Sequence, residues 1–164
     1  MTQTLSTNPP KKRNQSPLNA ILLTALLAGT LDAISATVNF WIHGSKGAER
    51  IWKYVASAAL GASARTGGTG IILLGLLFHY IIAFAFTLFY FLVYPKMPLL
   101  SKNIVLSALL YGIFVWIVMN LGIVPLSYIG KFPSTLEGVI TNMFILIIAI
   151  GLPVAWGARR YYGK

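Results

Sequence analysis

The stretch LNAILLTALLAGTLDAISATVNFWI, residues 18–42, decides the fold class of this chain. It is almost wholly apolar and carries one acid, Asp32, near its middle. A helix rises about 1.5 Å per residue and the hydrocarbon core of a bilayer is about 30 Å thick, so the stretch is long enough to cross a membrane. An ionisable side chain at that depth costs about 3 kcal/mol on insertion scales and commonly marks a functional site. Asp32 is therefore the leading candidate residue.

The composition of the whole chain also indicates a membrane protein. Of its 164 residues, 57% are hydrophobic and 10% are charged, against roughly a quarter charged in soluble domains. The 13 Lys and Arg lie at the edges of apolar stretches, where they suit the lipid bilayer better than a nucleic acid. No nucleic-acid-binding motif is present. The absence of cysteine excludes disulfides and thiolate chemistry.

Three further apolar stretches complete the predicted architecture, an all-α integral membrane bundle of four transmembrane helices. The four spans are predicted at about residues 18–42, 71–94, 104–127 and 139–156, within a membrane domain over 18–158. Residues 1–17 are expected to be a disordered cytoplasmic tail and residues 159–164 a basic cytoplasmic tail. The first stretch is longer than the core of a secretory signal and contains an acid, which disfavours a cleaved signal peptide.

The segment between the first two spans has a different pattern. Over residues 47–64, apolar positions alternate with Lys and Arg at helical spacing, which predicts an amphipathic helix at the membrane interface. Whether residues 44–70 lie on the membrane or re-enter it stays open. The Gly-rich stretch that follows lacks the lysine and serine or threonine of a phosphate-binding loop, so it is interpreted as a hinge.

Polar and small residues on the first span predict how it packs. One helical face carries a polar stripe that is expected to point into the bundle: Thr24, Ala28, Asp32, Ser35 and Asn39. A ridge of small residues beside it would let a neighbouring helix approach closely: Ala25, Gly29 and Ala33. On the third span, Ala108 and Gly112 form a similar small-residue pair, and Asn120 offers another polar group.

The distribution of bases predicts the orientation. With four spans, eight Lys and Arg lie on the side that holds both termini and the connector between the second and third spans, and five lie on the other side. The positive-inside rule therefore places both termini in the cytoplasm.

The stretches FHYIIAFAFTLFYFLVYPKMPLL and SALLYGIFVWIVMNLGIVPLS carry a family resemblance. They resemble small bacterial inner-membrane proteins of the YagU-like family in nine positions: His79, Phe84, Tyr94, Pro95, Lys96, Gly112, Asn120, Pro125 and Leu126. The resemblance covers roughly the middle third of the chain. It implies a location in the bacterial inner membrane, and no catalytic residue follows from it.

The polar residues favour transport over catalysis. His79 is the other titratable group expected at depth, so it and Asp32 could pair or relay a proton. The sequence therefore predicts a small transporter or channel-like protein for protons, cations or a small solute, with Asp32, His79, Ser35, Asn39 and Asn120 as candidate residues. Four short helices enclose little volume, so a path between two protomers, and hence a homodimer, fits this hypothesis.

Other functions stay open. In the alternative hypothesis, hydrogen bonds hold Asp32 and the residue fixes helix packing, in a structural or accessory membrane protein that binds lipid or a partner subunit. Haem ligation by His43 and His79 is disfavoured because the two residues are expected at different depths. No catalytic or metal-binding spacing is present, so no enzymatic activity, cofactor or metal is predicted.

Overall fold

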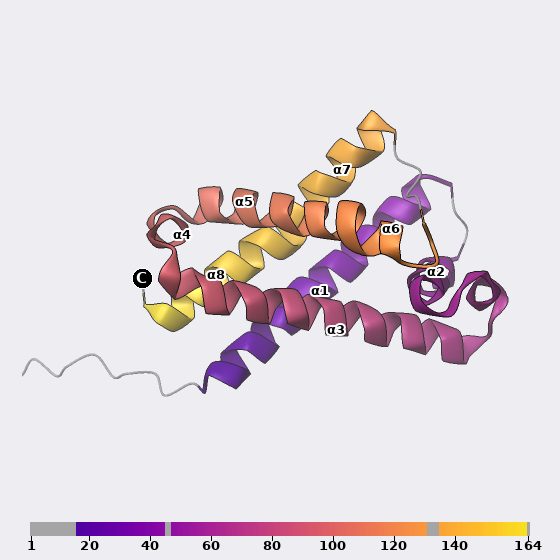
Figure 1. The fold of residues 1–164 in the computed structure, drawn as a ribbon, viewed down its shortest axis with the longest axis horizontal. Helices are drawn as coiled ribbons and strands as arrows, with labels where there is room; N and C mark the ends of the chain where they lie inside the picture. Colours follow the sequence, from indigo (N-terminus) through magenta and orange to yellow (C-terminus); the bar gives the residue numbers. More distant parts are fainter. Residues whose placement is uncertain (1–15, 45–46, 131–134, 164) are drawn as a thin grey trace, which may run out of the picture.

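The computed structural model describes residues 16–44, 47–130 and 135–163, and the regular structure in those ranges is helical (Figure 1). Within them, four helical segments are long and apolar enough to cross a membrane: Pro17–Ile42, Thr69–Lys96, Ile104–Leu126 and Leu136–Tyr162. The prediction of an all-α protein with four such helices is confirmed in number, length and composition. Their insertion into a bilayer stays a prediction.

Shorter elements subdivide and connect these segments. The first segment is α1 (Pro17–Ile42), and the second is α3 (Thr69–Val93) with the 3-10 turn η2 (Tyr94–Lys96). The helix α4 (Pro98–Lys102) leads to the third segment, which comprises α5 (Ile104–Ile117), the π-helix η3 (Val118–Ile123) and α6 (Val124–Leu126). The fourth comprises α7 (Leu136–Leu146), the π-helix η4 (Ile147–Gly151) and α8 (Leu152–Tyr162). Between the first two segments lie α2 (Glu49–Leu60) and the 3-10 helix η1 (Ala62–Thr66).

Side-chain caps fix where three segments begin. Ser16, Asn103 and Thr135 each accept a hydrogen bond from a backbone amide of the first turn that follows. Pro17 stands at the first helical position of α1, where its fixed φ is suitable and its missing amide costs nothing. Of the predicted tail over residues 1–17, only these last two residues are described, and they form the start of α1; residues 1–15 lie outside the described ranges.

Two prolines explain the π-helical segments. Pro125 and Pro153 each stand two residues after a π-helix, η3 and η4 respectively. A proline ring collides with the carbonyl group four residues earlier, and a wider π turn before the proline relieves that collision. The chain therefore passes both prolines without leaving the helix. The third segment ends at Leu126, one residue after Pro125, which agrees with the usual effect of a proline on a helix. The fourth segment continues for nine residues beyond Pro153.

The fourth segment extends beyond its predicted limits of 139–156 at both ends. It begins at Leu136 because Thr135 caps it, and it continues to Tyr162. The Tyr162 hydroxyl donates to the carbonyl oxygen of Phe91 at 2.9 Å, which holds the last turn of α8 against α3. Residues 159–162 were predicted as part of a basic tail and are instead helical.

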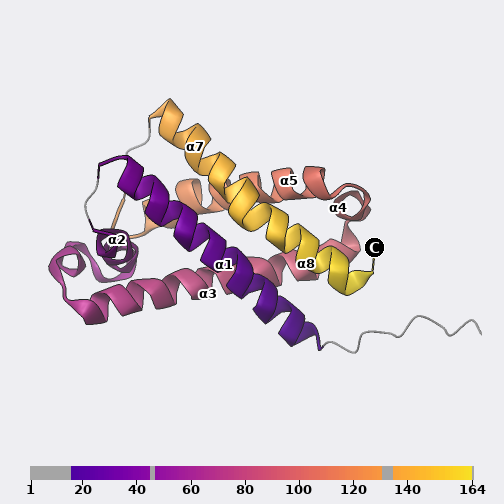
Figure 2. The same ribbon diagram turned by 180° about the vertical axis from the view of Figure 1, so that it is seen from behind.

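The four segments pack in two layers. Figure 2 shows α1 beside α7 and α8, and Figure 1 shows α3 and α5 together in the opposite layer, with the two pairs crossing obliquely. Residue contacts link α1 to both α3 and α8, and link α5 to η4 and α8. The first described turn of α1, α4 and the end of α8 lie at one end of the molecule, while α2 and the start of α7 lie at the other. Four antiparallel passages through a bilayer require this arrangement of ends.

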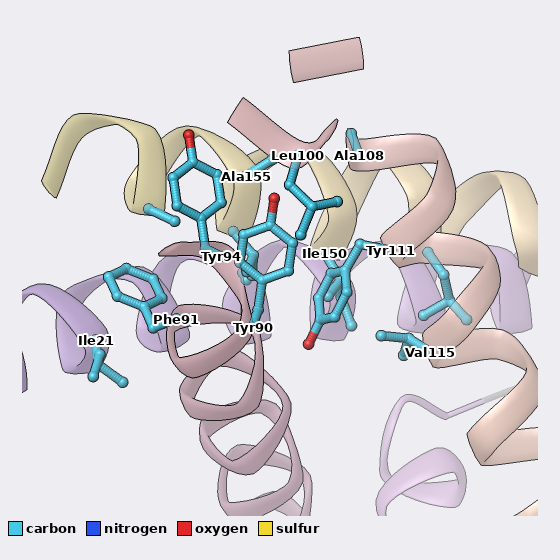
Figure 3. Packing of buried hydrophobic residues seen from close by; sticks show 14 of the residues in the cluster. Ile21, Tyr90, Phe91, Tyr94, Leu100, Ala108, Tyr111, Val115, Ile150 and Ala155 are labelled. Atoms are coloured by element: carbon cyan, nitrogen blue, oxygen red, sulfur yellow. The ribbon is translucent and has the colours of Figure 1, made fainter. Parts of the chain in front are cut away.

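Aromatic side chains fill the space between the layers at the end that carries α4. Figure 3 shows Tyr90, Tyr94 and Tyr111 in this cluster, and all three are buried. The Tyr111 hydroxyl donates to the carbonyl oxygen of Phe86 at 2.5 Å, and the hydroxyls of Tyr90 and Ser107 are hydrogen-bonded to each other. A buried phenol without a partner is costly, and these bonds avoid that cost for Tyr90 and Tyr111, whereas the buried Tyr94 hydroxyl has no hydrogen-bond partner among the described residues.

Glycines allow the closest helix contacts. A Cβ atom on Gly112 would lie 2.5 Å from Ile147 Cα, and one on Gly151 would lie 2.3 Å from the carbonyl oxygen of Ala108. The Ala108 and Gly112 pair predicted from the sequence therefore does pack against another helix, at the crossing of α5 and η4.

Large apolar side chains cover the outside of the four segments. Exposed examples occur on each of them, such as Leu23 on α1, Leu73 on α3, Leu121 in the third segment and Phe144 in the fourth. A water-soluble domain does not expose apolar surface on this scale, whereas a bilayer solvates it. Helix length, composition and exposed surface together favour one class of protein, the multi-pass helical membrane proteins.

Candidate functional site

Asp32 lies on α1 where that helix crosses α3. The small residue that permits this crossing is Gly29, because a Cβ atom there would lie 3.1 Å from both Ala83 Cβ and a ring carbon of Tyr80. The predicted small-residue ridge of α1 therefore does face a neighbouring helix, and that helix is α3. Asp32 stands three residues further along α1 and is half-buried.

α3 brings His79 to the same crossing. The His79 Nε2 atom lies 2.8 Å from the carbonyl oxygen of Gly29. A carbonyl oxygen only accepts hydrogen bonds, so Nε2 carries the proton in this contact, and in the neutral ring Nδ1 is left as the proton acceptor. The contact fixes both the orientation and the tautomer of the ring.

Asp32 and His79 are close enough to interact electrostatically. The structure thus brings these two candidate residues to the same helix crossing. No hydrogen bond joins the Asp32 carboxyl group to any residue in the described ranges. An acid that only fixes helix packing is expected to be held by such bonds, and His79 is the titratable side chain that the structure brings near Asp32.

Helix α2 covers this crossing at the end of the molecule opposite α4. The ring of Trp52 meets the His79 ring edge-on, with 5.5 Å between their centroids. α2 approaches α3 so closely that a Cβ atom on Gly75 would lie 1.9 Å from the carbonyl oxygen of Trp52. Figure 1 shows α2 end-on while α1, α3 and α5 are seen from the side, so α2 lies across the bundle.

The covering helix shows what the sequence pattern missed. The sequence correctly predicts a helix in residues 47–64, but the helix ends at Leu60, and Gly61, with φ of 83°, separates it from η1. Its buried face consists of Trp52, Ala56 and Ser57, and the sequence pattern did not indicate which helix this face would contact. The one signal in the sequence was Gly75, because a glycine inside an apolar helix often marks a close approach. The position of α2 at a membrane interface stays a prediction.

The remaining candidate residues have less definite surroundings. Ser35 and Asn39 are half-buried on α1, whereas Thr24 and Ala28 of the same stripe are fully buried. Asn120 lies in η3, where its Nδ2 atom donates to the carbonyl oxygen of Trp116 in the preceding turn at 3.0 Å. This bond occupies Asn120 within its own helix, and no contact in the described ranges joins it to Asp32.

The two histidines have different environments. His43 is exposed just after α1, where its Nδ1 atom donates to the carbonyl oxygen of Asn39 at 2.8 Å. His79 is half-buried at the helix crossing. Among the described residues, no group of three or more His, Cys, Asp and Glu residues is placed to hold a metal ion.

No protein-family model, curated protein or solved structure matches the chain. The resemblance to the YagU-like family stays a prediction.

Proposed function

We propose that the protein is a small membrane transporter or channel-like protein for protons, cations or a small solute, in which Asp32 and His79 form the coupling site. The observation that carries this proposal is the crossing of α1 and α3, where an acid without hydrogen bonds to described residues lies within electrostatic reach of an imidazole. Ionisable groups inside membrane helices are expensive and mark ion or proton pathways. The bacterial inner membrane and a homodimer belong to the same proposal.

The chemistry of the pair supports proton exchange. Asp32 can hold or release a proton, and His79, with Nε2–H fixed on the Gly29 carbonyl group, can accept one at Nδ1. A proton that moves from Asp32 to His79 leaves the net charge of the pair unchanged, whereas uptake or release of a proton by the pair changes that charge, and an uncompensated charge at this depth is unfavourable. Movement of a substrate or of α2 can therefore be coupled to protonation.

Asp32→Asn tests this proposal in proteoliposomes with an imposed pH gradient and an internal pH-sensitive dye. Positioned proton-transfer groups typically contribute 10²- to 10⁴-fold, so we expect proton flux to fall by about a hundredfold, to the level of empty vesicles. Glu137→Gln is the matched control, because Glu137 is an exposed acid in the first turn of α7. It should leave the flux unchanged.

Two results would contradict the proposal. Equal proton flux in the wild-type protein and in Asp32→Asn would show that Asp32 has no role in proton coupling. A wild-type protein that passes no more protons than empty vesicles, and whose infrared spectrum shows no pH-dependent carboxyl band that Asp32→Asn abolishes, would favour a structural or accessory protein instead.

A further inference from the structure

An apolar groove follows α1 from Thr30 to Trp41 on the side that faces α2 and α3. It consists of two depressions of about 320 and 200 Å³ that share Thr37 and Val38. Trp52 and Tyr80 line the larger of the two, and Gly47 and Ala48 line the one nearer the end of α1. This groove lies beside the Asp32 crossing, and no residue of the proposed coupling site lines it.

The walls of the groove suit an alkyl chain. The two hydroxyl groups of α1 along it are already used within the protein. Thr30 Oγ1 is hydrogen-bonded to the Tyr80 hydroxyl at 3.0 Å, and Thr37 Oγ1 donates to the carbonyl oxygen of Ala33 at 2.7 Å. A ligand in the groove therefore needs no polar group to form hydrogen bonds with these two hydroxyls.

The length of the groove matches one leaflet of a bilayer. Thr30 and Trp41 are eleven residues apart on a helix, which corresponds to about 16 Å, and half of the hydrocarbon core is about 15 Å. Trp41 is 74% exposed at the outer end of the groove, as is typical of aromatic residues at a membrane surface. The groove thus extends from the surface of the predicted membrane to its middle.

Two basic residues follow the outer end of the groove in the sequence. The lining residue Ala48 immediately precedes α2, and the first turns of α2 carry Arg50, which is exposed, and Lys53, which is half-buried. Glu49 lies in the same turn and partly opposes them. We propose that the groove is a specific lipid site, which holds one acyl chain of an anionic phospholipid with its headgroup phosphate against Arg50 and Lys53.

Fluorescence of Trp52 tests the site directly. A full-length variant with Phe in place of Trp41, Trp116 and Trp156 leaves Trp52 as the only indole, and bromine on a lipid chain quenches an indole that it contacts. The protein is reconstituted in phosphatidylcholine vesicles that contain a small fraction of either brominated phosphatidylglycerol or brominated phosphatidylcholine. We expect phosphatidylglycerol to be enriched at Trp52 by about thirtyfold, which corresponds to about 2 kcal/mol for the two bases together.

Two variants with matched controls locate the lipid. Thr37→Phe fills the groove and should abolish the excess quenching, whereas Leu27→Phe, on the exposed face of α1 outside the groove, should not. Arg50→Gln combined with Lys53→Gln should make the two lipids quench equally, whereas Lys96→Gln, at the opposite end of the molecule, should preserve the preference. Glu49→Gln should increase it.

Two outcomes overturn the proposal. The first is equal quenching by the two brominated lipids in the wild-type groove, or quenching that Thr37→Phe leaves unchanged. The second is an unquenched Trp52 together with a disulfide-linked dimer of Ile34→Cys in membranes, which would show that a second copy of the chain occupies the groove. The charge variants alter an exposed helix face, so they test the site even if the groove-filling variant fails to fold.

Discussion

Single residues set the geometry of the proposed coupling site. Gly29 lets α3 approach α1, and its carbonyl oxygen then holds His79 at 2.8 Å. A helix carbonyl group that already accepts a bond within its own helix has a second lone pair, so His79 can bind without breaking α1. The ring is thereby held near Asp32, which is three residues from Gly29 in the sequence.

The pKa of Tyr54 depends on two features of its surroundings, burial on α2 and the nearby Arg65. Burial on α2 raises the pKa of Tyr54 above its usual value of 10.0, and the guanidinium group of Arg65, 5.4 Å from the ring centroid, opposes that rise in pKa. We expect Arg65→Gln to raise the pKa of Tyr54 further. The measurement is an ultraviolet titration of tyrosinate, taken as the difference from Tyr54→Phe because the chain has 8 tyrosines.

The raised pKa also predicts how the docking of α2 depends on pH. Because the folded chain binds the phenol proton more tightly than the unfolded chain, Tyr54 stabilises the fold below about pH 10, and this contribution is lost as pH rises through the raised pKa. Tyr54→Phe should remove this alkaline component of the unfolding curve. A pKa of Tyr54 that falls in Arg65→Gln would contradict the assigned contact.

At the scale of elements, α2 is the helix whose position matters most for the site. Its Trp52 carbonyl group lies over Gly75, about 9 Å along α3 from the start of that helix. Interfacial helices are commonly buried 5–10 Å into the boundary of a membrane, so the depth agrees with the predicted interfacial helix. A second link comes from the connector after α6, where the Tyr128 amide donates to the carbonyl oxygen of Ala58 at 3.0 Å.

Gly75→Ala is predicted to displace α2 from α3. The new methyl group would lie 1.9 Å from the Trp52 carbonyl oxygen, and backbone atoms cannot yield as a flexible side chain can. We expect a loss of about 1–3 kcal/mol in the free energy of unfolding, together with a change in Trp52 fluorescence in the single-tryptophan background described above.

Gly70→Ala is the matched control on the same helix. Nothing lies within 4 Å of a Cβ atom at Gly70, so this change should be neutral or slightly stabilising through better helix propensity. Equal effects of the two substitutions would contradict the close contact between α2 and α3.

At the scale of the whole molecule, the two ends differ in structure and charge. One end carries α4, the first described turn of α1 and the end of α8, and the other carries α2 and the start of α7. The positive-inside rule predicts that the first end is cytoplasmic, because the predicted topology assigns eight of the 13 Lys and Arg of the sequence to that side. The orientation stays a prediction.

The absence of cysteine makes the orientation simple to test. Lys102→Cys and Arg50→Cys place single thiols at exposed positions on opposite ends. In intact cells, we expect a membrane-impermeant maleimide to label Arg50→Cys, and to label Lys102→Cys only after the membrane is permeabilised. The reverse labelling pattern would show that the protein has the opposite orientation in the membrane. Labelling of both variants in intact cells would contradict four passages through the membrane.

The sequence by itself determined the class of the fold. Apolar stretches of bilayer length fixed four long helices, and the spacing of small residues around Gly29 and Gly112 correctly marked two faces where helices cross. These features are local, because helix length and helix face follow from the 3.6-residue period alone. Asp32 was identified in the same way, as a costly group inside an apolar helix.

Only the tertiary structure decided what those faces contact. The sequence predicts an amphipathic helix over residues 47–64, and only the structure shows that its Trp52 packs against His79, because Gly75 leaves room for the backbone of α2. It also ended the fourth helix at residue 156, whereas the bond from Tyr162 to Phe91 holds the helix to its last turn. Contacts between residues far apart in the chain depend on how surfaces fit together, and a periodic pattern along one helix does not contain that information.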